Sequence, residues 1–316
     1  MRKLSFIKFL KPVNFIFLVF LSVTTYGETC DPNLNYESRL TEKYSESAKY
    51  SSQWSKSAFG KKVVILIHGL NNPQTLMDDL QVALDDGQTH FISLSLRGHS
   101  GDGDDFVNVK PEDWIGQLST AYCLGLQYAP AQKIHIIGFS LGGAITLSTL
   151  HDRKLQVGSV TLLAPAVELP FFSRLIRASE YLPNDWVIPS MNRREFQVYK
   201  GSSVALYRGL NHLYQHFQMN KDEHFAQTQR GLVIVGDGDE LVDADKLGST
   251  FSVGVWLDHW NVEVLDTKVR HNKILFGHML PVKKFYEEED WVSFISLIKK
   301  NFDSATPPHP EHDRSK

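Results

Sequence analysis

The chain has 316 residues, of which 42% are hydrophobic and 22% are charged. This is an ordinary globular composition, and the length is sufficient for one large domain with an insertion. A formal net charge of -3 gives no reason to expect binding to phosphate backbones, so we expect no nucleic-acid partner.

The first 27 residues have the three regions of a secretory signal peptide. Four basic residues come first, before any acidic one: Arg2, Lys3, Lys8 and Lys11. An apolar run over residues 15–23 follows, and it is short for a membrane span. We therefore predict cleavage near Gly27 and export to the periplasm or the medium, with an uncleaved N-terminal membrane anchor as the alternative.

Cleavage would change the net charge of the chain from -3 to -7, because residues 1–27 hold four basic and no acidic residues. The remaining cysteines would be Cys30 and Cys123. An oxidising compartment would allow them to form a disulfide, whereas a buried free thiol at Cys123 is the alternative.

Residues 28–60 form a polar N-terminal segment without clear periodicity. From residue 61 on, apolar strands alternate with helices, and we expect strands at 61–67, 90–96, 134–137 and 157–165 and helices at 73–86, 111–128 and 144–150. Such alternation is typical of parallel strands joined by right-handed crossovers. We therefore predict an α/β fold, with a mostly parallel central sheet and helices on both faces.

The alternation stops near residue 168 and resumes at residue 231. We interpret the aromatic-rich, helically patterned segment 168–230 as a helical cap insertion over the carboxyl edge of the sheet. The core would then comprise residues 61–167 and 231–302, including a strand at 262–265 and a closing helix at 289–302. The tail, residues 303–316, has three prolines and no apolar run, and we expect it to be disordered.

The most specific motif is Gly138-Phe139-Ser140-Leu141-Gly142, which follows an apolar strand and precedes a helix. A serine hydroxyl becomes an effective nucleophile only when it is exposed at a strained turn with a base in reach. Small residues on either side allow the backbone to make that turn. The motif therefore predicts that Ser140 is a nucleophile.

A serine nucleophile requires a base, and the base requires an acid that orients it. Asp237 and Asp239 follow the apolar strand 231–236, at the edge where open α/β sheets place reacting groups. Among the late histidines, His278 is expected in a loop on the same edge, and His271 is the rival base. We interpret His68 and His99 as structural, Asp243 as a helix start and Glu240 as solvated surface.

These motifs, in this order, resemble the α/β-hydrolase superfamily, and within it the capped carboxylesterase and monoacylglycerol-lipase-like serine hydrolases. The resemblance covers residues 60–302 and rests on five short motifs: His68-Gly69, Arg97-Gly98-His99-Ser100, Gly138 to Gly143, Gly236 with Asp239, and Gly277-His278. It implies that Ser140 attacks, that His278 is the base, and that Asp239 rather than Asp237 is the acid. It also implies an oxyanion hole formed by the backbone N–H groups of Leu70 and Leu141.

The resemblance implies a serine hydrolase that cleaves carboxylic esters through an acyl-enzyme. Together with the predicted signal peptide and the aromatic-rich cap, it leads us to expect an exported enzyme that acts on medium-chain or monoacyl lipid-like esters. Thioesterase, aminopeptidase and acyltransferase activities of the same fold are the alternatives, and a non-catalytic binding module is a further one. No metal-ligand spacing or phosphate-binding loop is evident, so we expect no metal and no cofactor. The partners expected are a small ester or lipid substrate and, through the cap, transient contact with a membrane surface.

Overall fold

The computed structural model describes residues 30–42, 48–101, 103–170, 176–190, 192–221, 230–253, 259–266 and 277–303. The predicted signal peptide, the rival base His271 and residues 304–316 of the predicted tail lie outside these ranges. No helix within them is both long and apolar enough to cross a membrane.

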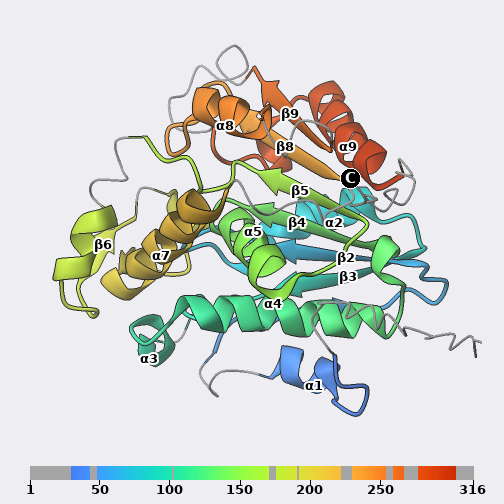
Figure 1. The fold of residues 1–316 in the computed structure, drawn as a ribbon, viewed down its shortest axis with the longest axis horizontal. Coiled ribbons are helices and arrows are strands. Elements are labelled where there is room, and N and C mark those ends of the chain that lie inside the picture. The colour runs from blue at the N-terminus through green and yellow to red at the C-terminus, as the bar shows by residue number, and fades with distance from the viewer. Residues whose placement is uncertain are drawn as a thin grey trace, which may run out of the picture.

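A seven-stranded sheet lies at the centre of the protein, with the strand order β1-β3-β2-β4-β5-β8-β9 (Figure 1). All neighbouring pairs are parallel except β1 with β3, which confirms the prediction of a mostly parallel sheet. The strands are β1 (Gln53–Ser55), β2 (Lys62–Ile67), β3 (Thr89–Leu94), β4 (Ile134–Phe139), β5 (Ser159–Leu163), β8 (Gly231–Gly236) and β9 (Trp260–Leu265).

The direction of each crossover determines which face of the sheet its helix covers. The chain moves one way from β2 to β3 and the other way from β3 through β4 and β5, so right-handed crossovers place the intervening helices on opposite faces. Accordingly, α2 (Asp78–Leu84) packs against α9 (Glu288–Asp303), whereas α4 (Pro111–Leu126) packs against α5 (Leu141–Arg153). Helix α8 (Ala244–Phe251) lies between β8 and β9 in the chain.

Five shorter helical turns complete the core and its connections: α3 (Gly103–Phe106), η1 (Gln74–Met77), η2 (Ala131–Lys133), η6 (Lys283–Phe285) and α1 (Tyr36–Thr41). The predicted helix at 73–86 is therefore divided into η1 and α2, and it ends at Leu84 because Asp85 is extended.

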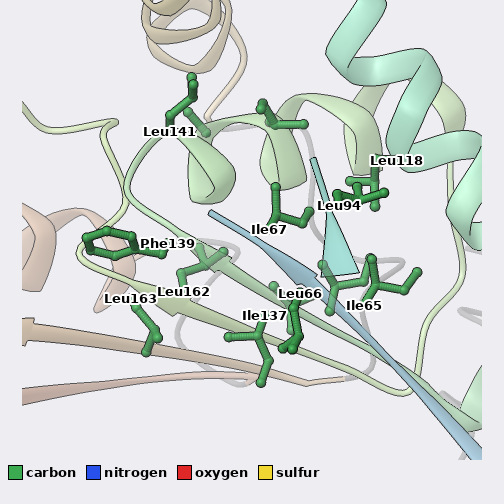
Figure 2. Packing of buried hydrophobic residues seen from close by; sticks show 14 of the residues in the cluster. Ile65, Leu66, Ile67, Leu94, Leu118, Ile137, Phe139, Leu141, Leu162 and Leu163 are labelled. Atoms are coloured by element: carbon green, nitrogen blue, oxygen red, sulfur yellow. The ribbon is translucent and has the colours of Figure 1, made fainter. Parts of the chain in front are cut away.

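The inner strands are buried on both faces, as their continuous apolar runs predict. Residues 63–67 of β2 are 0% exposed, and β4 is buried along its whole length. Figure 2 shows side chains of β2, β4 and β5 packed together with Leu118 of α4 and Leu141 of α5. This core holds the carboxyl ends of the strands, where the candidate site lies, in fixed relative positions.

The N-terminal segment is more ordered than its sequence indicates. Helix α1 buries Tyr36 and Leu40, and β1 pairs antiparallel with β3 at the edge of the sheet. Both elements are too short to produce a recognisable periodicity. Cys30 forms a disulfide with Cys123 of α4, so the pairing that the sequence left open is present.

We expect the disulfide to contribute substantially to stability, because it closes a loop over a sequence separation of 93 residues. Replacing Cys30 by serine should lower the free energy of unfolding by about 2–4 kcal/mol. Urea denaturation with and without a reducing agent measures this. The reducing agent should destabilise the wild type and leave the variant unchanged, and equal stability of the wild type in both conditions would contradict the expectation.

The described residues of segment 168–230 contribute no strand to the central sheet. Its long helix α7 (Val204–Asn220) agrees with the predicted helical pattern and packs against α5. A hairpin of β6 (Val187–Pro189) and β7 (Gly201–Ser203) was not predicted, because three-residue strands leave no alternating pattern. The turns η3 (Ser179–Tyr181) and η4 (Arg194–Phe196) complete the described part of this segment.

Candidate active site

Ser140 occupies a strained turn between β4 and α5. Its backbone has φ 51° and ψ -111°, in a region that residues other than glycine rarely adopt. Its N–H donates to the carbonyl of Leu163 at 2.9 Å, which ties the turn to β5. A Cβ at Gly142 would lie 2.4 Å from the carbonyl oxygen of Ile67, so the first turn of α5 can approach β2 only with glycine there. The motif therefore forms the strand–serine–helix corner that its sequence predicts.

Asp239 and His278, which are 39 residues apart, form a buried pair. His278 Nδ1 lies 2.9 Å and 3.0 Å from the two carboxylate oxygens of Asp239, and the two side chains are 5% and 0% exposed respectively. The carboxylate also accepts hydrogen bonds from the N–H groups of Leu241 and Val242, both at 2.9 Å. Because Nδ1–H donates to Asp239, Nε2 is left as the nitrogen that can accept a proton.

The loop before His278 fits closely against the loop that carries Asp239. A Cβ at Gly277 would lie 2.4 Å from the carbonyl oxygen of Gly238, so only glycine allows the two backbones to approach this far. This contact explains why a glycine directly precedes the histidine.

The charge of Asp239 determines the pKa of His278. Burial by itself lowers this pKa, but the negative charge of Asp239 and its hydrogen bond raise it, and Glu240 adds to the increase, so the net shift is upward from 6.5. Glu240 is half-buried, and its Oε2 has no hydrogen-bond partner among the described residues, which corrects our expectation of a solvated side chain. Burial raises the pKa of Glu240, and the nearby His278 partly offsets this.

Ser140 and His278 line the same cavity, which has a volume of about 320 Å³. The ring of Phe139, the residue before the serine, lies 5.1 Å from the ring of His278, which places the histidine beside the turn. The wall is largely apolar, and the core and segment 168–230 both contribute to it. Apolar lining residues are Leu70, Ala166, Leu169, Ile176, Ile188, Pro189, Leu210, Leu241 and Val242.

The two predicted oxyanion donors belong to Leu141, which follows the serine directly, and to Leu70, which lines the same cavity as the serine. Leu141 is the first residue of α5, and the first N–H groups of a helix have no acceptor within it. Leu70 lies in the turn after β2 and lines the cavity with Ser140. The positive end of the α5 dipole lies at the same place, so a developing negative charge is favoured there.

Two asparagines that sequence reasoning did not single out connect this turn to segment 168–230. Asn71, with φ 57°, donates to the carbonyl of Tyr199 and accepts from its N–H, both at 2.9 Å. Its own carbonyl accepts from the N–H of Val198 at 3.0 Å, and Asn72 donates to the carbonyl of Phe196 at 2.8 Å. The only sequence signal was their position directly after the motif His68-Gly69-Leu70.

His68 and His99 are fully buried neutral rings below the site. His68 Nδ1 donates to the carbonyl of Gly69 at 2.8 Å, and its Nε2 accepts from the N–H of Leu96 at 3.1 Å. Burial lowers the pKa to about 4 for His68 and to about 3 for His99. Both nitrogens of His68 are thus occupied by backbone groups, which supports the structural interpretation.

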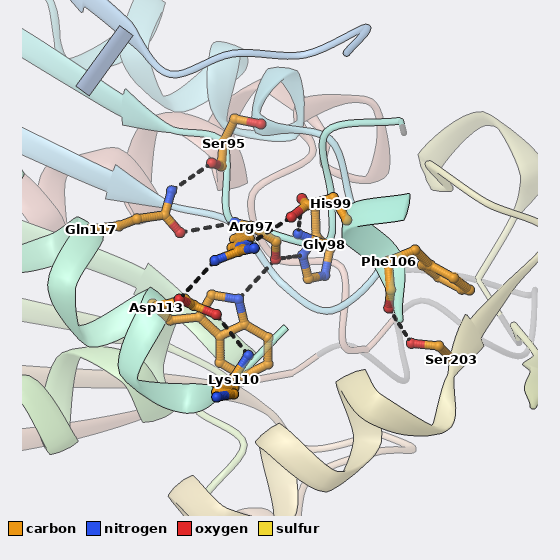
Figure 3. A network of polar contacts seen from close by, with 11 residues as sticks. Ser95, Arg97, Gly98, His99, Phe106, Lys110, Asp113, Gln117 and Ser203 are labelled. Atoms are coloured by element: carbon orange, nitrogen blue, oxygen red, sulfur yellow. Dashed lines mark hydrogen bonds and ion pairs between the residues drawn. The ribbon is translucent and has the colours of Figure 1, made fainter. Parts of the chain in front are cut away.

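The loop after β3 is held by a polar network around Arg97 (Figure 3). The guanidinium contacts Asp105 at 2.8 Å and Asp113 at 3.0 Å. The carbonyl of Arg97 accepts from the indole N–H of Trp114 at 2.9 Å, and its N–H donates to Gln117 at 2.9 Å. The motif Arg97-Gly98-His99-Ser100 therefore anchors a loop to α3 and α4.

The carboxylate that contacts His278 is that of Asp239, whereas the Asp237 N–H donates to the carbonyl of Leu265 at 2.9 Å. Asp243 is the N-cap of α8 and accepts from the N–H of Lys246 at 3.0 Å, as expected for a helix start.

Residues 64–271 match the model of the alpha/beta hydrolase family. The chain belongs to this family. A comparison with curated proteins found no match. Comparison with solved structures also finds similar folds, among them three that share 13–15% sequence identity with this chain.

These three structures cover 80–89% of this chain. One comes from the metagenome-derived lipolytic enzymes LipS and LipT, at 15% identity and a TM-score of 0.63, covering 80% of this chain and 98% of that one. A soluble variant of monoglyceride lipase from Saccharomyces cerevisiae, in complex with a substrate analog, has 13% identity and a TM-score of 0.66, with 89% and 96% covered. Est1E from Butyrivibrio proteoclasticus with bound ferulic acid has 13% identity and a TM-score of 0.54, with 82% and 98% covered.

Proposed function

We propose that this alpha/beta hydrolase is a serine esterase that forms an acyl-enzyme on Ser140. His278 Nε2 takes the proton from the Ser140 hydroxyl as it attacks the acyl carbon, and then donates it to the leaving alcohol. Asp239 holds His278 in the required tautomer and stabilises its charged form. The observation that carries the proposal is that His278, which is paired with the buried carboxylate of Asp239, lines the same cavity as the strained Ser140.

The oxyanion of the tetrahedral intermediate would be bound by the N–H groups of Leu70 and Leu141. Such donors each contribute on the order of 3 kcal/mol to lowering the barrier. They are backbone groups, so ordinary substitutions at these positions do not remove them.

The cavity supports a substrate with an acyl chain of medium length or a monoacyl lipid. Its volume is about 320 Å³, and its apolar side chains outnumber its polar ones. Besides Ser140 and His278, the polar lining residues are Asn72, Ser190, Asn192, Ser202 and Tyr207. An acyl chain would contact the apolar wall, and the alcohol portion would be placed near these polar groups.

Rates with p-nitrophenyl esters of increasing chain length, a thioester and aminoacyl anilides test this assignment. We expect ester hydrolysis with an optimum at medium length and no anilide cleavage. Anilide cleavage without esterase activity would replace the proposal by a peptidase, and preferential thioester cleavage would replace it by a thioesterase. Failure of a fluorophosphonate probe to label the wild type at neutral pH would favour a non-catalytic binding module.

The acidic limb of kcat/KM should report the pKa of His278, which is raised by Asp239. The base must be neutral to accept a proton, so the rate should fall as the pH decreases through a midpoint above 6.5. Measurements of kcat/KM between about pH 4 and 9, with a soluble short-chain ester, test this. A rate that stays constant down to about pH 4 would contradict the role of His278 as base.

We further propose that the protein is exported and that segment 168–230 acts as a cap that contacts lipid surfaces. The Cys30–Cys123 disulfide supports an oxidising compartment. Tyr181 and Trp186 are 90% and 58% exposed, and the neighbouring residue Ile188 lines the cavity. Aromatic side chains of this kind favour membrane interfaces, and binding to phospholipid vesicles measures the contact.

A further inference from the structure

A second polar cluster lies at the opposite end of α5 from Ser140. His151 and Asp152 belong to the last turn of α5, and His216 belongs to α7. The three are brought together only by the packing of α7 against α5. Local sequence spacing gave no indication of this group, because His216 is 65 residues from His151.

One candidate ligand atom of each of the three residues lies close to the other two. His151 Nδ1 lies 2.9 Å and His216 Nε2 lies 2.8 Å from the same oxygen, Asp152 Oδ1, and the two nitrogens are 3.3 Å apart. Two nitrogens bound to one tetrahedral zinc ion, with Zn–N distances of about 2.0–2.1 Å, are also separated by about 3.3 Å.

The triangle of these atoms is close to the size that an ion requires, although the two N–O distances of 2.8 and 2.9 Å would have to open by about 0.5 Å to reach the separation of tetrahedral ligands. The three atoms lie on a circle with a radius of about 1.7 Å, so an ion about 2.0–2.1 Å from each would sit about 1.1 Å out of their plane. This leaves one side open for water, and the side chains, which are 19% to 33% exposed, are accessible to an ion from solvent.

The surroundings provide further support for a cation. Asp152 and His216 line a cavity of about 310 Å³ together with His212 and Glu112, while Arg153 contributes an opposing positive charge there. The C-terminal end of α5 carries the negative end of the helix dipole, which favours a cation.

We propose that His151, Asp152 and His216 bind a zinc-class divalent transition-metal ion that ties α7 to α5. Two imidazoles and a carboxylate form a donor set that suits zinc, and water would complete the coordination. The ion would not take part in ester cleavage, because residue 151 lies about 16 Å along the helix axis from Ser140. It would instead restrain α7, which contributes Tyr207 and Leu210 to the cavity that Ser140 and His278 line.

Zinc titration by calorimetry on the chelator-treated chain, produced without a histidine tag, tests this site. We expect one equivalent to bind with a Kd of about 1–10 μM, and Tm to rise by on the order of 5 °C at a hundredfold excess over Kd. His216→Gln and Asp152→Asn should each weaken binding at least tenfold. The matched control, His259→Gln beside β9, should bind like the wild type.

A wild-type Kd weaker than about 100 μM, or unchanged affinity in His216→Gln, would overturn the proposal. Should a variant fail to fold, cobalt substitution of the wild type remains decisive. A tetrahedral Co²⁺ spectrum that zinc displaces supports the site, and the spectrum of hydrated octahedral Co²⁺ overturns it. None of these readouts depends on esterase activity, so the site and the proposed function fail or succeed separately.

Discussion

Ser140→Ala should lower the rate of ester cleavage by about 10⁴- to 10⁶-fold, because it removes the nucleophile and leaves only the binding and oxyanion groups. The variant should fold, since Ser140 shapes the turn through its backbone and the alanine removes one oxygen. Steady-state rates with a p-nitrophenyl ester measure the loss, and labelling by a fluorophosphonate should disappear with it.

Ser148→Ala is a matched control on the same helix. Its hydroxyl is buried and has no hydrogen-bond partner among the residues described. This variant should keep wild-type labelling and turnover. Retention of more than a tenth of the wild-type rate in Ser140→Ala would rule out the acyl-enzyme mechanism.

Asp239→Asn should reduce kcat/KM by about 10⁴-fold. The asparagine oxygen can still accept from Leu241 and Val242, but its NH₂ group faces His278 Nδ1 and favours the wrong tautomer. Loss of the negative charge should also move the acidic limb of the pH profile to lower pH, because the interaction that raises the pKa of His278 is removed while burial remains.

Asp237→Asn is the control for Asp239→Asn, because the two aspartates lie two residues apart in the same loop. The activity of Asp237→Asn should stay within a few-fold of the wild type. The opposite pattern, with Asp237→Asn inactive and Asp239→Asn active, would assign the acid to Asp237. A pH limb that does not move in Asp239→Asn would show that this carboxylate does not control the protonation of His278.

The inner strands and the serine corner could be predicted because their signals are local. The apolar runs at 62–67 and 134–139 reflect burial on both faces, and β8 spans the predicted residues 231–236. The two glycines around Ser140 are required by contacts within the turn and with β2. The choice between Asp237 and Asp239 depended on family resemblance. In the structure it is the carboxylate of Asp239 that contacts His278 Nδ1.

Other features have no local signal. The hairpin of β6 and β7 and strand β1 are each three residues long, so they depend on partners elsewhere in the chain. Glu240 was interpreted as solvated because it is charged, yet the loops of Asp239 and His278 partly enclose it.

By itself, the amino-acid sequence determined the alternating order of strands and helices, the nucleophile candidate and the two cysteines that could pair. These depend on hydrophobic periodicity and backbone sterics, which act between near neighbours. Tertiary structure alone decided that Cys30 meets Cys123, that Asn71 and Asn72 hold segment 168–230, and that His216 reaches the end of α5. Contacts of this kind arise when distant segments pack together. The identity of a single side chain does not indicate which distant residue it will contact.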